Sequence, residues 1–123
     1  MPTTTVLCPA IALPQKRRIA KELAFWWRQS GVDINHAITR FTEVAADSVY
    51  SGPMPMAGAP FAFVQCVVAA DRDTAFKARY AAQVRRSLAE IAPADRVFVS
   101  FQPTDPNDHF INVTDDPTAE GTA

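Results

Sequence analysis

The residue whose chemistry stands out first is Pro2, directly after the initiator methionine. Methionine is commonly removed before a small residue such as proline, which would leave Pro2 with a secondary amine at the start of the chain. An unperturbed α-amino group has a pKa of about 7.7–8.0, and burial or a nearby cation lowers that value. A base titrating near neutral pH can move a proton between carbon and oxygen. Pro2 is therefore a candidate general base, and the alternative is a processed terminus without a chemical role.

Two arginines could bind an anionic substrate. Arg72 lies just before a predicted helix, and a guanidinium group binds a carboxylate through two parallel hydrogen bonds. The alternative for Arg72 is a surface ion pair with Asp71 or Asp73. Arg40 lies in the middle of a predicted strand, where a lone charge is unusual. Arg40 is expected to line a pocket or a subunit interface, unless it faces solvent.

The cysteines and histidines do not have metal-binding spacing. Cys8 and Cys66 lie far apart in apolar segments and are predicted to be free thiols in the core. His109 has Asp105 and Asp108 nearby, but the segment is rich in turn residues and reads as a solvated loop. We therefore expect no metal and no cofactor.

Length and composition favour one globular domain. The chain has 123 residues, 48% of them hydrophobic, with a net charge of -1. This composition excludes a mainly disordered chain, and no apolar run is long enough to span a membrane. The charge balance does not favour a nucleic-acid or membrane partner. We expect a domain over residues 1–114, a flexible tail over 115–123 and, without a signal sequence, a cytoplasmic location.

The first half of the chain has a strand–helix–strand pattern. A β-branched run predicts a strand from Thr3 to Cys8. Pro14 suits the first turn of a helix and Gly31 its end, with apolar residues at helical spacing between them. A second strand is predicted over residues 37–44. Residues 45–60 form a long loop rich in glycine and proline, interrupted by a short strand at residues 48–50.

The second half repeats this order. A strand is predicted over residues 61–68, followed by a helix that begins after Asp73 as its N-cap. Apolar residues spaced by three or four continue to Ile91, and Pro93 closes the helix. A strand over residues 96–102 follows, and residues 110–113 are predicted to form a short final strand.

The two halves also resemble each other in sequence. Pro2, Val6 and Cys8 have the same spacing as Pro60, Val64 and Cys66. We therefore expect a duplicated β-α-β unit, with repeats over residues 2–44 and 60–102. Each helical crossover makes its two strands parallel. The predicted fold is α+β: a four-stranded mixed sheet with two helices on one face.

The sheet face opposite the helices is expected to need a second layer. Phe61, Phe63, Phe98 and Phe101 place apolar side chains on both faces of the strands in the second half. Strands that are apolar on both faces imply a covering layer, and this chain has no further element to supply it. Self-association is the simplest way to cover that face.

Several of these features together resemble the tautomerase superfamily. They are Pro2, the length of two β-α-β units, Arg72 before the second helix, and the segment over residues 93–101. The last of these is similar to the fourth strand of macrophage migration inhibitory factor and its relatives. Residues 41–52 look most like the cis-3-chloroacrylic acid dehalogenase branch, and the decarboxylase branch also keeps an arginine before helix two. The resemblance covers residues 2–113.

The resemblance implies a homotrimer without cofactor, with Pro2 as general base and acid on a small 2-oxo or enol carboxylic acid. Arg72 would bind the substrate carboxylate. Phe98 and Ser100 would close the pocket of a neighbouring subunit, and Arg40 would line a pocket or interface. One of the two tryptophans of the first helix, Trp26 or Trp27, is expected in the core.

The sequence departs from each branch of the superfamily in some residues. Trp26 stands near the catalytic histidine of the cis-dehalogenases, Ala69 near one of their arginines, and Ser100 at their pocket tyrosine. Hydrolytic dehalogenation therefore lacks its usual residues, and the physiological substrate stays open.

Three alternatives remain at this point. Pro2 could stay protonated and serve a decarboxylase or hydratase of a related acid. The chain could be a trimer that has lost catalysis. It could also be a ferredoxin-like ligand-binding module, because that fold has the same order of strands and helices.

Overall fold

The structure is a computed structural model, and it describes residues 1–108. The first β-α-β unit consists of β1 (Thr3–Cys8), α1 (Leu13–Gln29) and β2 (Ile38–Glu43). Pro14 lies in the first turn of α1, and Gly31 follows its end with a φ of 95°. A positive φ is accessible to glycine without steric cost, which explains why the helix ends there. The predicted elements of this half are confirmed.

The second unit consists of β5 (Ala62–Ala69), α2 (Thr74–Ser87) and β6 (Val97–Thr104). The Asp73 carboxylate accepts a hydrogen bond of 2.7 Å from the Phe76 backbone N–H, so the predicted N-cap is confirmed. The prediction that the helix continues to Ile91 and is closed by Pro93 is wrong. The N–H groups of Ile91 and Ala92 instead donate to the Leu88 carbonyl, so a turn continues the buried apolar pattern after the helix has ended.

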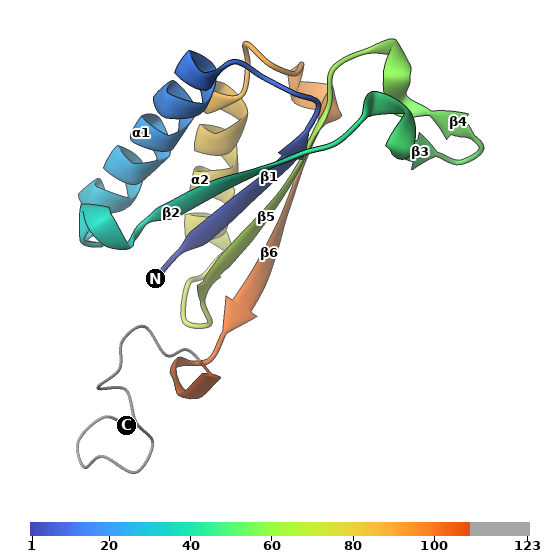
Figure 1. Cartoon of the computed structure of the whole chain (residues 1–123). Helices are drawn as coiled ribbons and strands as arrows, with labels where there is room; N and C mark the ends of the chain where they lie inside the picture. Colours follow the sequence, from blue (N-terminus) through green and yellow to red (C-terminus); the bar gives the residue numbers. More distant parts are fainter. Residues whose placement is uncertain (109–123) are drawn as a thin grey trace.

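The segment between the two units projects beyond the sheet (Figure 1). It holds a small hairpin of β3 (Tyr50–Ser51) and β4 (Met54–Pro55). The strand predicted at residues 48–50 begins two residues later and ends one residue later, because Gly52, with a φ of 58°, makes the turn and sets the pairing. The final strand predicted at residues 110–113, His109 and the tail over 115–123 lie outside the described residues.

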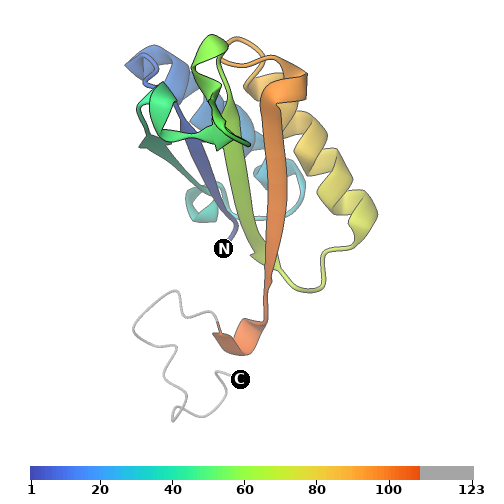
Figure 2. The ribbon, with the colours of Figure 1, turned by 90° about the vertical axis from the view of Figure 1, so that its right-hand side faces the viewer.

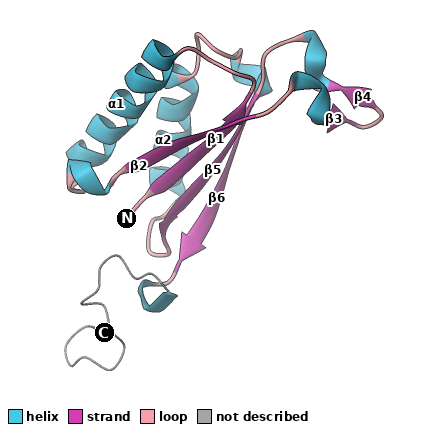
Figure 3. Ribbon diagram, viewed as in Figure 1, coloured by secondary structure: helices cyan, strands magenta, loops and turns pink. Residues whose placement is uncertain are grey.

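The four long strands form one mixed sheet in the order β2-β1-β5-β6. Within each unit the two strands are parallel, and β1 and β5 join the units by antiparallel pairing. Both helices lie on the same side of the sheet (Figures 2 and 3). The predicted fold class, a duplicated β-α-β unit with two helices on one sheet face, is confirmed.

The two faces of the sheet differ in exposure. Alternate residues of β1 and β5 are buried against the helices, among them Val6, Val64 and Cys66. Trp27 completes this core with an exposed fraction of 2%, which confirms that one of the two tryptophans is internal. On the opposite face Phe63 and Phe98 stack with their ring centroids 4.8 Å apart and stay 37% and 43% exposed.

A buried hydrogen bond joins β1, one of the two central strands, to α2. Thr4 Oγ1 and Tyr80 Oη lie 2.5 Å apart, and both side chains are almost completely buried. Burial raises the pKa of Tyr80 to about 12, so the phenol stays protonated at any physiological pH.

We predict that the Thr4 and Tyr80 hydroxyls are energetically coupled. Tyr80→Phe should lower the free energy of unfolding by about 1–3 kcal/mol, because the buried Thr4 hydroxyl loses its partner. Thr4→Val should have a similar effect. The double variant should lose less than the sum of the two, since neither hydroxyl is then left alone. Urea unfolding of the four proteins measures this, and strictly additive losses would contradict it.

Candidate active site

The amino end of the chain lies at one end of the two central strands. Thr3 pairs with Ile38 of β2 and with Val67 of β5. The Ile38 N–H donates a hydrogen bond of 2.9 Å to the Pro2 carbonyl, and Pro2 is buried while Met1 is 40% exposed. Pro2 is therefore held in place by backbone pairing at the edge of the folded body.

Arg72 lies in the same corner because β5 is antiparallel to β1. The connection from β5 to α2 starts where β1 starts, and the Arg72 N–H donates to the Ala69 carbonyl at 3.2 Å. The guanidinium carbon lies 4.4 Å from the ring centroid of Phe76 and 5.6 Å from that of Trp27. Within residues 1–108 no carboxylate lies within ion-pair distance of Arg72. The alternative of an ion pair with Asp71 or Asp73 is not what the structure shows.

The electrostatics of this corner favour a neutral amine. Burial lowers the pKa of the Met1 α-amino group, and the positive charge of Arg72 lowers that pKa further. Both effects disfavour the protonated form, since one removes water and the other adds a like charge. The structure thus brings the amino end and Arg72 together, while the roles assigned to Pro2 and Arg72 stay predictions.

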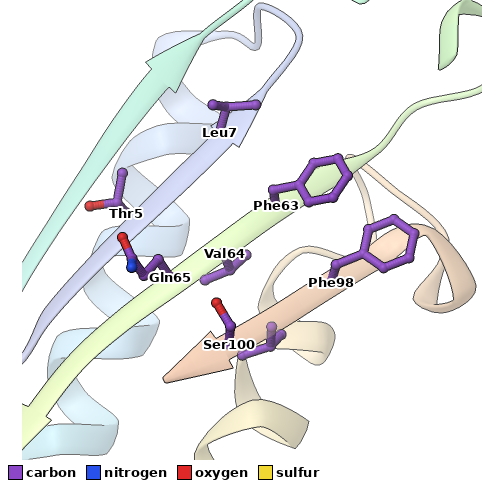
Figure 4. Close-up of a pocket in the computed structure, with 8 residues that line it drawn as sticks. Thr5, Leu7, Phe63, Val64, Gln65, Phe98 and Ser100 are labelled. Atoms are coloured by element: carbon purple, nitrogen blue, oxygen red, sulfur yellow. The ribbon is translucent and has the colours of Figure 1, made fainter. Parts of the chain in front are cut away.

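Phe98 and Ser100 lie elsewhere, on the open face of the sheet. They line a hollow of about 320 Å³ together with residues of the neighbouring strands β5 and β1 (Figure 4). The strand register arranges the side chains in two rows. One row is apolar and consists of Leu7, Phe63 and Phe98, and the other is polar and consists of Thr5, Gln65 and Ser100.

Arg40 extends the polar row onto β2. It pairs with Thr5 in the strand register, and its Nε–H donates a hydrogen bond of 2.8 Å to Thr5 Oγ1. The side chain is exposed on the face that carries the hollow. Arg40 thus lies in the same row as Ser100, with β1 and β5 between them, and neither Pro2 nor Arg72 lines the hollow of Phe98 and Ser100. One chain alone gives two separate groups of predicted site residues.

A second cavity, of about 480 Å³, lies at the opposite end of β1. Its lining includes Cys8, Gln15, Glu90 and the segment over residues 57–60. Sequence reasoning did not predict it, although the long loop over residues 45–60 was a signal. Arg96 fixes this loop by donating hydrogen bonds to the carbonyls of Met56, Ala59 and Pro60.

Both cysteines are free and buried, as predicted. Burial raises the pKa of Cys66 to about 12 and also raises that of Cys8, so both remain protonated and unreactive near neutral pH. Among residues 1–108 no three potential ligands from His, Cys, Asp and Glu converge on a metal-sized site, and no helix is long and apolar enough to cross a membrane.

The residues that sequence reasoning missed are the two rings that contact Arg72. Trp27 and Phe76 were interpreted only as core residues at helical spacing. The signal available was the distance of four residues between Arg72 and Phe76 across the start of a predicted helix.

We predict that Arg72→Gln raises the pKa of the amino-terminal amine. The substitution removes one of the two causes that lower this pKa, and burial, the larger cause, remains. The pKa should therefore rise without reaching the unperturbed value. A ¹⁵N NMR titration of the terminal residue measures it, with Arg17→Gln on the exposed side of α1 as the control. An unchanged pKa in Arg72→Gln would show that the guanidinium does not act on the amine.

Comparison with solved structures supports the fold, whereas comparison with family models and curated proteins finds no match. Among solved structures, a fused 4-OT asymmetric trimer is similar with a TM-score of 0.78, 20% identity and coverage of 89% of this chain and 91% of that one.

Two further solved structures have the same fold. Macrophage migration inhibitory factor from Toxoplasma gondii has a TM-score of 0.74 at 16% identity, over 90% of this chain and 96% of that one. A malonate semialdehyde decarboxylase inhibited by 3-bromopropiolate has a TM-score of 0.72 at 17% identity, over 89% and 88%. The chain therefore has the fold of these tautomerase-superfamily structures, which confirms at the level of the fold the resemblance seen in the sequence.

Proposed function

We propose that this chain is a cofactor-free, tautomerase-like enzyme that acts on a small 2-oxo or enol carboxylic acid. The amine of Pro2, exposed when Met1 is removed, would be the general base and acid. The observation that carries the proposal is the corner where Arg72 lies at the amino end, in which burial and Arg72 both lower the pKa of the Met1 α-amino group. The Pro2 amine would take the place of that group in the same corner once Met1 is removed. Such an amine is neutral, and therefore basic, at a lower pH than an ordinary chain terminus.

The proposed reaction moves one proton out and one proton in. The Pro2 nitrogen takes the proton from the enol oxygen, while the Arg72 guanidinium binds the substrate carboxylate and stabilises the negative charge of the enolate. The protonated amine then donates a proton to the adjacent carbon of the enolate. The product is the 2-oxo acid, and the amine returns to its neutral form. The balance needs no oxidant, metal or cofactor.

A homotrimer is part of the proposal because one chain leaves the site incomplete. Phe98 and Ser100 lie on the open face and do not reach Pro2 within the same chain. We infer that the open face packs against further copies, which bring these two residues to the pocket of a neighbouring subunit. The exposed stack of Phe63 and Phe98 supports such packing. Two of the similar structures, both of fused 4-OT, are an asymmetric and a symmetric trimer.

We place this enzyme in the cytoplasm, where its buried thiols would stay reduced.

A decarboxylase of a related small acid is the second candidate, because a malonate semialdehyde decarboxylase has the same fold. That reaction, or a hydration, would use Pro2 in its protonated form. Burial and Arg72 lower the pKa of the Met1 α-amino group, and the same two influences on a Pro2 amine would support the tautomerase. A trimer without catalysis is an outcome of the tests that follow. The ferredoxin-like module is contradicted by the sheet, because that fold splits each β-α-β unit with an intervening strand, whereas β1 and β2, and β5 and β6, are direct neighbours here.

The first test is the ketonisation of phenylenolpyruvate, followed by ultraviolet absorbance. Pro2→Ala should lower kcat/KM by about 10²-fold or more, because a primary amine with a different orientation replaces the ring nitrogen. Pro53→Ala, in the exposed hairpin turn, is the matched control and should keep full activity. Intact mass must show that Met1 is gone. A correctly trimmed wild type that does not ketonise the enol would exclude the tautomerase and favour the decarboxylase or a trimer without catalysis.

The second test concerns the assembly. Light scattering after size exclusion should give about three times the 13.5 kDa of the chain. Phe98→Asp should shift the mass towards the monomer, because a charge would have to be buried in the contact. Phe25→Asp changes a similarly exposed phenylalanine on the helical layer and should leave the trimer intact. A wild-type monomer would contradict the proposed site, which needs residues of a neighbouring copy.

A further inference from the structure

Two aromatic rings, Trp27 and Phe76, form a surface under the Arg72 guanidinium that we call the aromatic shelf. The guanidinium carbon lies 4.4 Å from the ring centroid of Phe76 and 5.6 Å from that of Trp27. The two rings lie 5.4 Å apart, so they act on the cation together. A cation over an aromatic face is attracted by about 0.5–2 kcal/mol, with the higher values where water is excluded.

The shelf is held rigidly from behind. Trp27 is buried on α1, and Tyr80 of α2 packs against its ring at 4.8 Å. Phe76 lies in the first turn of α2, where its backbone N–H is fixed by the Asp73 carboxylate at 2.7 Å. Because core packing and a helix cap fix the rings, they define one location for the cation that rests on them.

Arg72 depends on the shelf because other partners are missing among the described residues. Residues 1–108 provide no carboxylate within ion-pair distance of Arg72 and no side-chain hydrogen bond to its guanidinium. An unsupported arginine side chain keeps many rotamers and loses that freedom when it binds a ligand. The planar rings restrict it without neutralising its charge or occupying the donors that a carboxylate needs.

We propose that Phe76 is a positioning residue: with Trp27, it holds the Arg72 guanidinium beside the amino end, ready to bind the carboxylate of the substrate. The proposal rests on the proposed function, in which Arg72 binds that carboxylate. It adds that affinity for the acid depends on a ring which does not itself touch the substrate. Arg79 offers an internal comparison, since its guanidinium carbon lies 5.8 Å from the same ring but belongs to an exposed side chain of α2.

The test compares the enol acid with its methyl ester, which lacks the carboxylate charge. Phe76→Met keeps the volume and removes the ring, and it should raise KM for the acid about 3- to 10-fold, as the loss of a cation–π contact predicts. KM for the ester should stay unchanged. Phe76→Tyr keeps the ring and should restore the wild-type KM, and Arg79→Gln should behave as wild type. An equal rise in KM for the acid and the ester would show that the substitution disturbs the site without a specific effect on carboxylate binding, and it would overturn the proposal.

A second measurement separates this inference from the proposed function. The ¹⁵N titration of the terminal amine needs no turnover, and Phe76→Met should raise its pKa in the same direction as Arg72→Gln. If wild type lacks activity but this rise occurs, the positioning role stands and the proposed reaction fails. If the pKa stays at the wild-type value, the shelf does not place Arg72.

Should Phe76→Met fail to fold, Arg72→Lys replaces it. A lysine keeps the charge but not the planar contact with the shelf, so KM for the acid should rise while the ester is unaffected. A wild-type KM for the acid in Arg72→Lys would overturn the proposal.

Discussion

The antiparallel pairing of β1 with β5 is the constraint on which the rest of the structure depends. Each β-α-β unit has parallel strands, so a unit alone places the start of its first strand far from the start of its helix. The antiparallel junction turns the second unit around, and the end of β5 comes to lie beside the start of β1. Arg72, three residues after β5, therefore reaches the amino end although it is remote in sequence.

The pairing of β1 with β5 also determines which side chains face the helices and which face the open side of the sheet. Residues in phase with Thr4 and Val6 point to the helices and are buried, while those in phase with Thr5 and Leu7 line the open hollow (Figure 4). A side chain on β6 can belong to only one of these faces. Ser100 is on the open face, so in the proposed function it would join Pro2 through another copy of the chain. Assembly and catalysis are thus a single requirement in the proposed function.

The sequence was sufficient for the four long strands, for α1 and for the start of α2, because their signals are local. The β-branched run of β1, the Asp73 cap and the glycine after α1 each act within a few residues. The end of α2 was not predictable in this way, since the apolar spacing continues to Ile91 through a turn that buries the same face.

The candidate site was predictable only in part, for a different reason. Pro2 and Arg72 have side chains whose chemistry is visible in isolation. The role of Phe76 depends on which cation lies over its ring, which is a tertiary fact, and a phenylalanine at core spacing gives no sign of it. The cavity near Cys8 was likewise not predictable from the sequence, because it forms between distant segments that include the loop held by the Arg96 hydrogen bonds.

The charge balance of the corner has one more consequence for the proposed reaction. Arg72 has no carboxylate within ion-pair distance among residues 1–108, and its charge disfavours a proton on the neighbouring amine. A bound substrate carboxylate would compensate that charge, so the pKa of the amine would rise when the acid binds. By linkage, the acid would also bind more tightly to the protonated enzyme. Arg72 would thus lower the basicity of the amine in the free enzyme, and the bound substrate carboxylate would raise it.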